Sequence, residues 1–221
     1  MKRILLPLIA LLLTIGATAQ TTEKRTRVLM ETSHGKMTFE LYNETPIHRD
    51  NFIFLVKSGT YRGVLFHRVI SQFMVQGGNP LSRGAKPLAD LNNDTTKLTL
   101  PAEIMPETHF HRRGALCAAR TGDDVNPERR SSTVQFYIVT GRFFTDFDLE
   151  NLSKETKKVF TEAQKQAYMH EGGTPHLDGD YTVFGQLVDG WKTLTKIERQ
   201  HTDERNRPLK DIIILNMEIL Q

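Results

Sequence analysis

Short strand-like runs separated by turn residues constrain the fold of this chain more than any other feature. Residues 28–42 alternate apolar and polar side chains around Ser33-His34-Gly35, a pattern typical of a hairpin with one solvent-facing side. More strand-like runs follow, each bounded by Gly, Pro, Asn or Asp, at 64–70, 74–76, 114–119, 134–139, 181–188 and 211–220. Many short strands with few helices predict an all-β sandwich or barrel.

Two helices are expected outside these strands. The first spans residues 46–58. Thr45 offers an N-cap, Pro46 suits the first helical position, and Gly59 ends the apolar stripe. The second helix runs from about residue 191 to residue 197. With only these two helices predicted outside residues 142–173, the chain is expected to be predominantly β.

Residues 142–173 depart from the strand pattern and are predicted to be a helical insertion. Charged residues dominate this segment, and Gly172-Gly173 closes it. Its apolar face is too narrow to form a core alone, so we expect it to pack on the rest of the domain or on a bound polypeptide. The apolar residues at helical spacing are Val159, Phe160, Ala163 and Ala167.

The N-terminal residues have the three parts of a secretory signal. Basic residues at 2–3 precede an apolar core at 4–15, and Ala17-Thr18-Ala19 offers the small residues that signal peptidase accepts. We expect residues 1–19 to be removed and the protein to be periplasmic or secreted. A retained anchor is the alternative, but the apolar core is shorter than the roughly 20 residues that span a membrane. No membrane span is expected in the mature chain.

The rest of the chain is expected to form one domain. A polar segment at 20–26 precedes it, and residues 27–221 have the length of an ordinary domain that carries an insertion. The formal net charge of +3 falls by two when Lys2 and Arg3 are removed. Such an even balance gives no sign of a nucleic-acid partner.

The cysteine and histidine content predicts neither a disulfide nor a metal site. Cys117 is the only cysteine, so an intrachain disulfide is excluded, and its apolar neighbours predict a buried structural thiol. His109 and His111 share one face of a possible strand, but no cysteine or carboxylate nearby completes a zinc ligand set. No metal is therefore expected.

Four motifs in order resemble the cyclophilin-type peptidyl-prolyl cis-trans isomerases. Residues 66–78, FHRVISQFMVQGG, resemble the most characteristic segment of that family. The other motifs lie at 114–119, 134–138 and 176–185. The resemblance extends from about residue 28 to the C-terminus, except for the insertion. It implies an all-β fold in which a closed eight-stranded antiparallel barrel is capped by two helices.

The resemblance also implies an enzyme that rotates Xaa-Pro bonds of exported or unfolded polypeptides, with no cofactor and no covalent intermediate. Arg68 stands where the family has its catalytic arginine. Arginine suits this task because it stays cationic and presents rigid, directional donors to a twisted amide. The positions that match the peptide-binding surface of the family are Phe73, Met74, Gln76, Ala119, Arg120, Gln135, Tyr137, His176, Leu177 and Tyr181.

Four of these positions depart from the residues common in the family. Tyr137 replaces a phenylalanine, and His176 replaces a tryptophan. Arg120 replaces an asparagine, and Tyr181 replaces a histidine. Because His176 lacks the indole that the family uses to hold cyclosporin, weak cyclosporin binding is expected. A non-catalytic chaperone that grips proline-containing segments in the same groove is the alternative function, and a barrel without function is a third.

Overall fold

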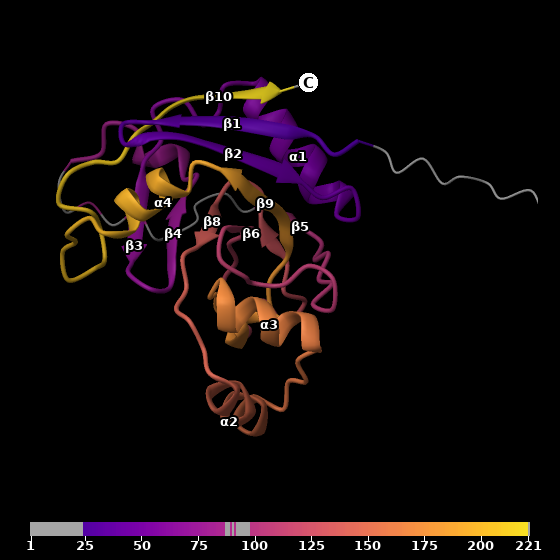
Figure 1. The fold of residues 1–221 in the computed structure, drawn as a ribbon. Helices are drawn as coiled ribbons and strands as arrows, with labels where there is room; N and C mark the ends of the chain where they lie inside the picture. The colour runs from indigo at the N-terminus through magenta and orange to yellow at the C-terminus, as the bar shows by residue number, and fades with distance from the viewer. Residues whose placement is uncertain (1–23, 87–88, 90, 92–97, 221) are drawn as a thin grey trace, which may run out of the picture.

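The computed structural model covers most of the predicted domain (Figure 1). It describes residues 24–86, 89, 91 and 98–220. The signal peptide predicted at 1–19 lies outside these residues, as does most of the polar segment at 20–26. Within the described part of the chain, no helix has the length and apolar character needed to cross a membrane.

Antiparallel strands make up most of the regular structure. They are β1 (Arg27–Thr32), β2 (Gly35–Leu41), β3 (Phe66–Ile70), β4 (Met74–Gly77), β5 (Thr99–Leu100), β6 (Ala115–Ala118), β7 (Ser131–Ser132), β8 (Phe136–Val139), β9 (Val183–Asp189) and β10 (Ile214–Leu220). Eight of them form one sheet in the order β10-β1-β2-β9-β6-β8-β4-β3, and β5 pairs with β7 separately. The hairpin predicted at the start of the domain is confirmed as β1 and β2.

The large sheet curls, but its two edge strands do not form a continuous ladder. The segments beside them meet through a single bridge between Leu65 and Ile213. A backbone hydrogen bond of 2.9 Å from Phe66 N to Ile212 O lies next to this bridge. The prediction of eight antiparallel strands is therefore confirmed, whereas the pairing shows a curled open sheet and not the closed barrel that was expected.

Aromatic side chains fill the inside of the curl. Phe136 of β8 is 1% exposed. Its ring lies 5.6 Å from that of Phe52, 5.4 Å from that of Tyr61 and 6.1 Å from that of Phe66, each nearly perpendicular. Edge-to-face contacts of this kind are favourable beyond the apolar area they bury. Phe136 therefore belongs to the core.

Two helices pack on the sheet close to their predicted positions: α1 (Pro46–Lys57) and α4 (Trp191–Glu198). Thr45 precedes α1 as expected, but its side chain makes no capping bond. The carboxylate of Glu103 accepts hydrogen bonds from the backbone N–H groups of Ile47 at 3.1 Å and His48 at 2.9 Å instead. A distant carboxylate thus satisfies the free donors at the start of α1.

The insertion contains two helices: α2 (Asp146–Thr156) and α3 (Glu162–His170). Each begins with a capping box, formed by Thr145 with Asp148 and by Thr161 with Gln164. Figure 1 shows both helices projecting from one end of the sheet, with α3 nearer to it. The insertion predicted at about 142–173 is thus helical, with a break that the sequence analysis did not anticipate.

The prediction that the insertion has one apolar helical face is wrong. Val159 is 88% exposed in the connection between α2 and α3, and Ala163 is also exposed. Phe160 and Ala167 are buried, but Phe160 lies in the same connection and not on a helix. Because the chain turns between the helices, residues before and after the turn do not share one helical face. The apolar cluster of the insertion centres on Leu149, Phe160 and Tyr168.

The insertion leaves and rejoins the sheet at adjacent backbone positions. Arg142 N donates to Gly173 O at 3.3 Å, and Gly173 N donates to Arg142 O at 3.0 Å. A Cβ atom at Gly141 would lie 2.4 Å from the Cα of Gly173, and Gly141 has a φ of +59°. Glycine is therefore required at position 141 by both space and backbone conformation. We call this close approach of Gly141, Arg142 and Gly173 the neck.

Candidate active site

Arg68 and Gln76 lie opposite each other on the paired strands β3 and β4. Arg68 Nη1 donates a hydrogen bond to Gln76 Oε1 at 3.2 Å, and Gln76 Nε2 donates to Gln135 Oε1 at 3.0 Å. Both ends of the Gln76 amide are thus engaged, which fixes the guanidinium beside it. Partial burial lowers the pKa of Arg68 from its ordinary value, but an arginine remains cationic at neutral pH.

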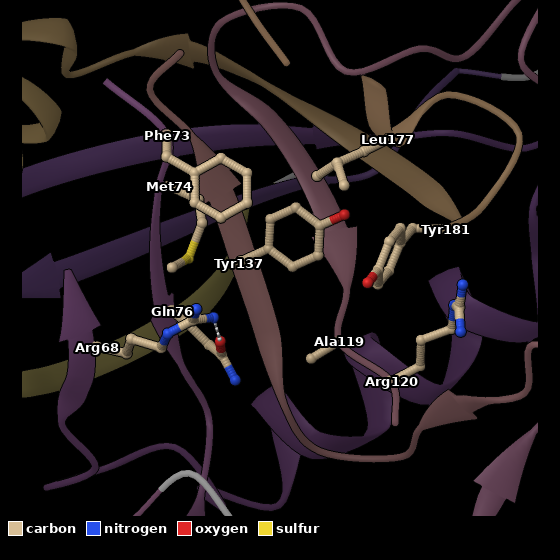
Figure 2. Close-up of a pocket in the computed structure, with 9 residues that line it drawn as sticks. All are labelled: Arg68, Phe73, Met74, Gln76, Ala119, Arg120, Tyr137, Leu177 and Tyr181. Carbon is tan, nitrogen blue, oxygen red and sulfur yellow. Dashed lines mark hydrogen bonds between the residues drawn. The ribbon is translucent and has the colours of Figure 1, made fainter. Parts of the chain in front are cut away.

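A cavity of about 330 Å³ opens beside the Arg68 guanidinium. Figure 2 shows the Tyr137 ring in the middle of it, with Phe73 and Met74 on one side and Leu177 and Tyr181 on the other. The cavity therefore combines two arginine side chains with aromatic and aliphatic ones. Its lining residues are Arg68, Phe73, Met74, Gln76, Ala119, Arg120, Tyr137, Leu177 and Tyr181.

The side chain of Arg120 braces one wall of the cavity. Its guanidinium lies 4.4 Å from the centroid of the Tyr181 ring, within the range of a cation–π contact. Arg120 Nε also donates to the carbonyl of Asp180 at 2.7 Å, and Nη1 donates to Asp123 Oδ1 at 2.5 Å. These bonds hold the arginine in place, so its presence organises the Tyr181 wall.

Two of the predicted site positions do not line the cavity. Gln135 is buried and reaches the site only through its hydrogen bond to Gln76. His176 is exposed, and its imidazole stacks on Phe73 with ring centroids 5.6 Å apart. The structure brings all the other predicted positions together around the cavity.

No cluster of potential metal ligands occurs in the described part of the chain. His109 and His111, which the sequence places on one face, have separate partners. The His109 ring stacks on Tyr42 at a centroid distance of 4.0 Å. His111 is 1% exposed and bonds to Asp178. Both histidines are therefore used in packing and hydrogen bonding.

The match to known proteins covers almost the whole described domain. The family model for cyclophilin type peptidyl-prolyl cis-trans isomerase/CLD matches residues 27–219. The chain belongs to the cyclophilin-type peptidyl-prolyl cis-trans isomerases.

Curated bacterial relatives of this cyclophilin carry names that describe peptidyl-prolyl cis-trans isomerases. One from Staphylococcus aureus (strain COL) is 33% identical over 194 residues, covering 87% of this chain and 91% of the relative. Another from Staphylococcus saprophyticus is 35% identical over 203 residues, covering 88% and 92%. These relatives match the domain over nearly their whole length.

Solved cyclophilin structures share the fold. The crystal structure of a Cryptosporidium parvum cyclophilin-type isomerase is 28% identical and has a TM-score of 0.64, covering 89% of this chain and 98% of the other. A second structure of that protein, in the presence of the dipeptide Ala-Pro, is 26% identical with a TM-score of 0.63 and covers 88% and 99%.

The buried hydrogen bonding behind Tyr137 in this cyclophilin was not predicted from the sequence. The hydroxyl of Tyr137, whose ring lines the cavity, lies 2.9 Å from Nε2 of His111. His111 Nδ1 donates to Asp178 Oδ1 at 2.8 Å, because an ionised carboxylate only accepts. Burial raises the pKa of Tyr137 well above its usual value, so its hydroxyl keeps its proton. The replacement of phenylalanine by tyrosine at 137 was the only signal in the sequence.

Proposed function

We propose that this cyclophilin accelerates rotation about the Xaa-Pro bonds of extended or unfolded polypeptides, with Arg68 as its catalytic residue. The position of the Arg68 guanidinium at the edge of an aromatic cavity carries the proposal. Only one of its N–H groups is bonded within the described residues, so others are available to a substrate. The cyclophilin structure obtained in the presence of Ala-Pro supports this class of substrate.

The chemistry of the reaction explains why a guanidinium suits it. Rotation about an Xaa-Pro bond passes a barrier of about 20 kcal/mol because twisting destroys amide resonance. As resonance is lost, the prolyl nitrogen becomes pyramidal and gains a basic lone pair. An N–H group of Arg68 can donate to that lone pair in the twisted state and has no such acceptor in the planar state. Interactions present only in the transition state are the ones that accelerate a reaction.

The magnitudes show that Arg68 does not act alone. Uncatalysed exchange takes tens of seconds, so millisecond exchange requires roughly 5 to 7 kcal/mol of barrier reduction. One charge-assisted hydrogen bond contributes about 1.5 to 3 kcal/mol. We assign the remainder to the walls of the cavity, where Phe73, Met74 and Leu177 hold the prolyl ring away from water.

The peptide chain on either side of the proline requires polar partners. Gln76 lies at the edge of the cavity next to Arg68, and beside its bonds to Arg68 and Gln135 its amide has a second N–H and a second carbonyl lone pair. Ala119 and the backbone of Arg120 lie along the opposite edge (Figure 2). We assign these groups to the main chain of the substrate, so that the flanking residues are held while the prolyl bond turns.

We also propose that the protein is exported and acts on polypeptides outside the cytoplasm. The basic, apolar and small-residue parts of residues 1–19 support this proposal. N-terminal sequencing of the mature protein from the periplasm or culture medium should begin at Gln20. A mature protein that begins at residue 1 would contradict export by cleavage.

A peptide isomerisation assay tests the proposed activity and separates it from the chaperone alternative. The purified domain should accelerate cis-to-trans exchange of an Ala-Pro tetrapeptide, measured by a proline-dependent protease or by NMR exchange. Binding of the same peptide without faster exchange would favour a non-catalytic chaperone. An Arg68→Ala protein that still binds the peptide but no longer accelerates exchange would assign the chemistry to Arg68.

A further inference from the structure

A buried series of hydrogen bonds connects the insertion to the cavity. The hydroxyl of Tyr168 on α3 donates to Asp178 Oδ2 at 2.5 Å. Asp178 Oδ1 accepts from His111 Nδ1 at 2.8 Å, and His111 Nε2 lies 2.9 Å from the Tyr137 hydroxyl. We call these four residues the relay. Tyr168 and His111 are each no more than 1% exposed, Asp178 4% and Tyr137 5%.

Asp178 is the junction of the relay, and its carboxylate is fully engaged. Besides Tyr168 and the His111 ring, it accepts from the backbone N–H of His111 at 2.9 Å and from Gln164 Nε2 of α3 at 3.3 Å. It also follows Leu177, which lines the cavity. A buried carboxylate is costly unless donors of this kind surround it, so the positions of its donors are mutually dependent.

His111 touches both tyrosines of the cavity. Its ring is stacked with Tyr137 at a centroid distance of 6.1 Å and meets Tyr181 edge-on at 6.2 Å. The two tyrosines meet each other at 5.8 Å in a perpendicular arrangement. The His111 ring therefore lies against two walls of the cavity.

The connection between α2 and α3 provides a second contact beside the cavity. Lys158 Nζ donates to the carbonyl of His176 at 2.6 Å and also bonds to the carboxylate of Asp180. His176 and Asp180 flank Leu177 and Asp178 in the sequence. Helix α3 and the connection between α2 and α3 thus both form hydrogen bonds with the segment 176–180.

We propose that Tyr168, Asp178 and His111 are positioning residues through which α3 sets the place of Tyr137 and so the affinity of the cavity for a prolyl ring. The inference rests on the proposed function, because the Tyr137 ring lines the same cavity as Phe73, Met74 and Leu177, to which the prolyl ring is assigned. The insertion is then part of the binding site although none of its side chains lines the cavity.

The test compares one substitution in two backgrounds. Tyr168→Phe should raise the KM and the Kd of an Ala-Pro tetrapeptide about threefold to tenfold with little change in kcat, the size expected for one lost hydrogen bond. In a Tyr137→Phe protein, whose relay is already broken, the same substitution should change KM and Kd less than about twofold. An equal rise in both backgrounds, or no rise in the wild-type background, would overturn the inference.

A spectroscopic readout and a matched control separate positioning from loss of stability. In protein with 13C-labelled tyrosine, Tyr168→Phe should shift the ring resonances of Tyr137. Leu149→Val removes one methylene from the apolar cluster that includes Tyr168 but changes no hydrogen-bonding group of the relay, so it should lower Tm and leave Tyr137 resonances and KM unchanged. A Leu149→Val protein with an equal rise in KM would show that packing, and not the relay, carries the effect.

Failure of this inference can be distinguished from failure of the proposed function. If the wild-type protein binds the peptide without isomerising it, the proposed activity fails, whereas the Kd comparison and the Tyr137 resonances still test the relay. If Tyr168→Phe does not fold, Gln164→Glu removes the other α3 donor to Asp178 Oδ2, keeps the side-chain oxygen that caps α3, and is compared in the same two backgrounds.

Discussion

The guanidinium of Arg68 is held by the neutral amide of Gln76, through one hydrogen bond of 3.2 Å across β3 and β4. No carboxylate pairs with Arg68 among the ion pairs of the described residues. A carboxylate partner would offset the positive charge, whereas an amide fixes the geometry and leaves the charge intact. Arg68 is thus oriented without being neutralised, as a cation that must meet a transient lone pair requires.

The first prediction concerns the planar set of N–H donors on the Arg68 guanidinium. Arg68→Lys keeps the charge but replaces the planar donor group with a more strongly hydrated ammonium. We expect kcat/KM to fall about 10-fold to 100-fold, in line with the loss of one charge-assisted hydrogen bond. Tm should change little, because Arg68 faces an open cavity and leaves no core void. Isomerisation and thermal unfolding are measured on the same preparation.

The matched control for this substitution is Arg62→Lys. Arg62 is exposed and donates to Asn216 Oδ1 at 3.1 Å, away from the cavity. The Arg62→Lys substitution should leave kcat/KM unchanged. Full turnover in Arg68→Lys, or an equal loss in Arg62→Lys, would remove the role assigned to Arg68.

The second prediction concerns cyclosporin. His176 is exposed and offers a smaller ring and no indole N–H beside Phe73. We expect the wild-type protein to bind cyclosporin weakly, and His176→Trp to lower Kd at least about tenfold, or roughly 1.4 kcal/mol. Calorimetric titration gives both values. His170→Trp on α3 serves as the control, and nanomolar binding by the wild-type protein would contradict the assignment of this loop.

The third prediction is a loss of stability in acid that depends on His67. Burial lowers the pKa of His67 from 6.5 to about 4. As the pH falls through 6.5 toward 4, the unfolded chain binds a proton that the folded chain does not. The free energy of unfolding should therefore be highest above pH 6.5 and fall by up to about 3 kcal/mol across this interval.

Urea unfolding at a series of pH values measures this dependence. His67→Gln should flatten the profile between pH 6.5 and 4, whereas His201→Gln, at an exposed position, should leave the slope unchanged. A wild-type profile that rises as the pH falls has the wrong sign and would refute the burial of a neutral His67.

The fourth prediction concerns the reactivity of Cys117. This thiol is fully buried on β6, and burial raises its pKa well above the usual value. Because the thiolate is the reactive form, a disulfide reagent should leave the folded protein unmodified and react with one thiol per chain in guanidinium chloride. Rapid reaction of the folded protein would show that β6 opens locally.

The pairing of Arg68 with Gln76 was predictable because it is encoded locally. Residues 66–78 contain both strands of one hairpin, so the pattern that predicts the strands also places Arg68 opposite Gln76. The position of His176 outside the cavity was not encoded in this way. His176 lies in a short 3-10 helix, Pro175–Leu177, whose carbonyl at His176 accepts a hydrogen bond from Lys158 of the insertion.

The relay was not predictable, because its members are distant in sequence and only packing brings them together. His111 and Asp178 are separated by 67 positions, and Tyr168 reaches Asp178 only because α3 folds back beneath the sheet. Single histidines and tyrosines carry no period that signals a shared network. The helix break was predictable in principle, since Thr145 with Asp148 and Thr161 with Gln164 are two separate capping signatures.

The neck brings the two ends of the insertion together, so the segment between them can change in length. Because Arg142 and Gly173 are hydrogen-bonded to each other, the insertion joins the sheet at the same two positions whether the segment between them is long or short. The entropic cost of lengthening such a closed loop grows only logarithmically with its length. A segment of another length can therefore replace the insertion without a change in the sheet, and each replacement also exchanges Tyr168 and Gln164, the α3 donors to Asp178.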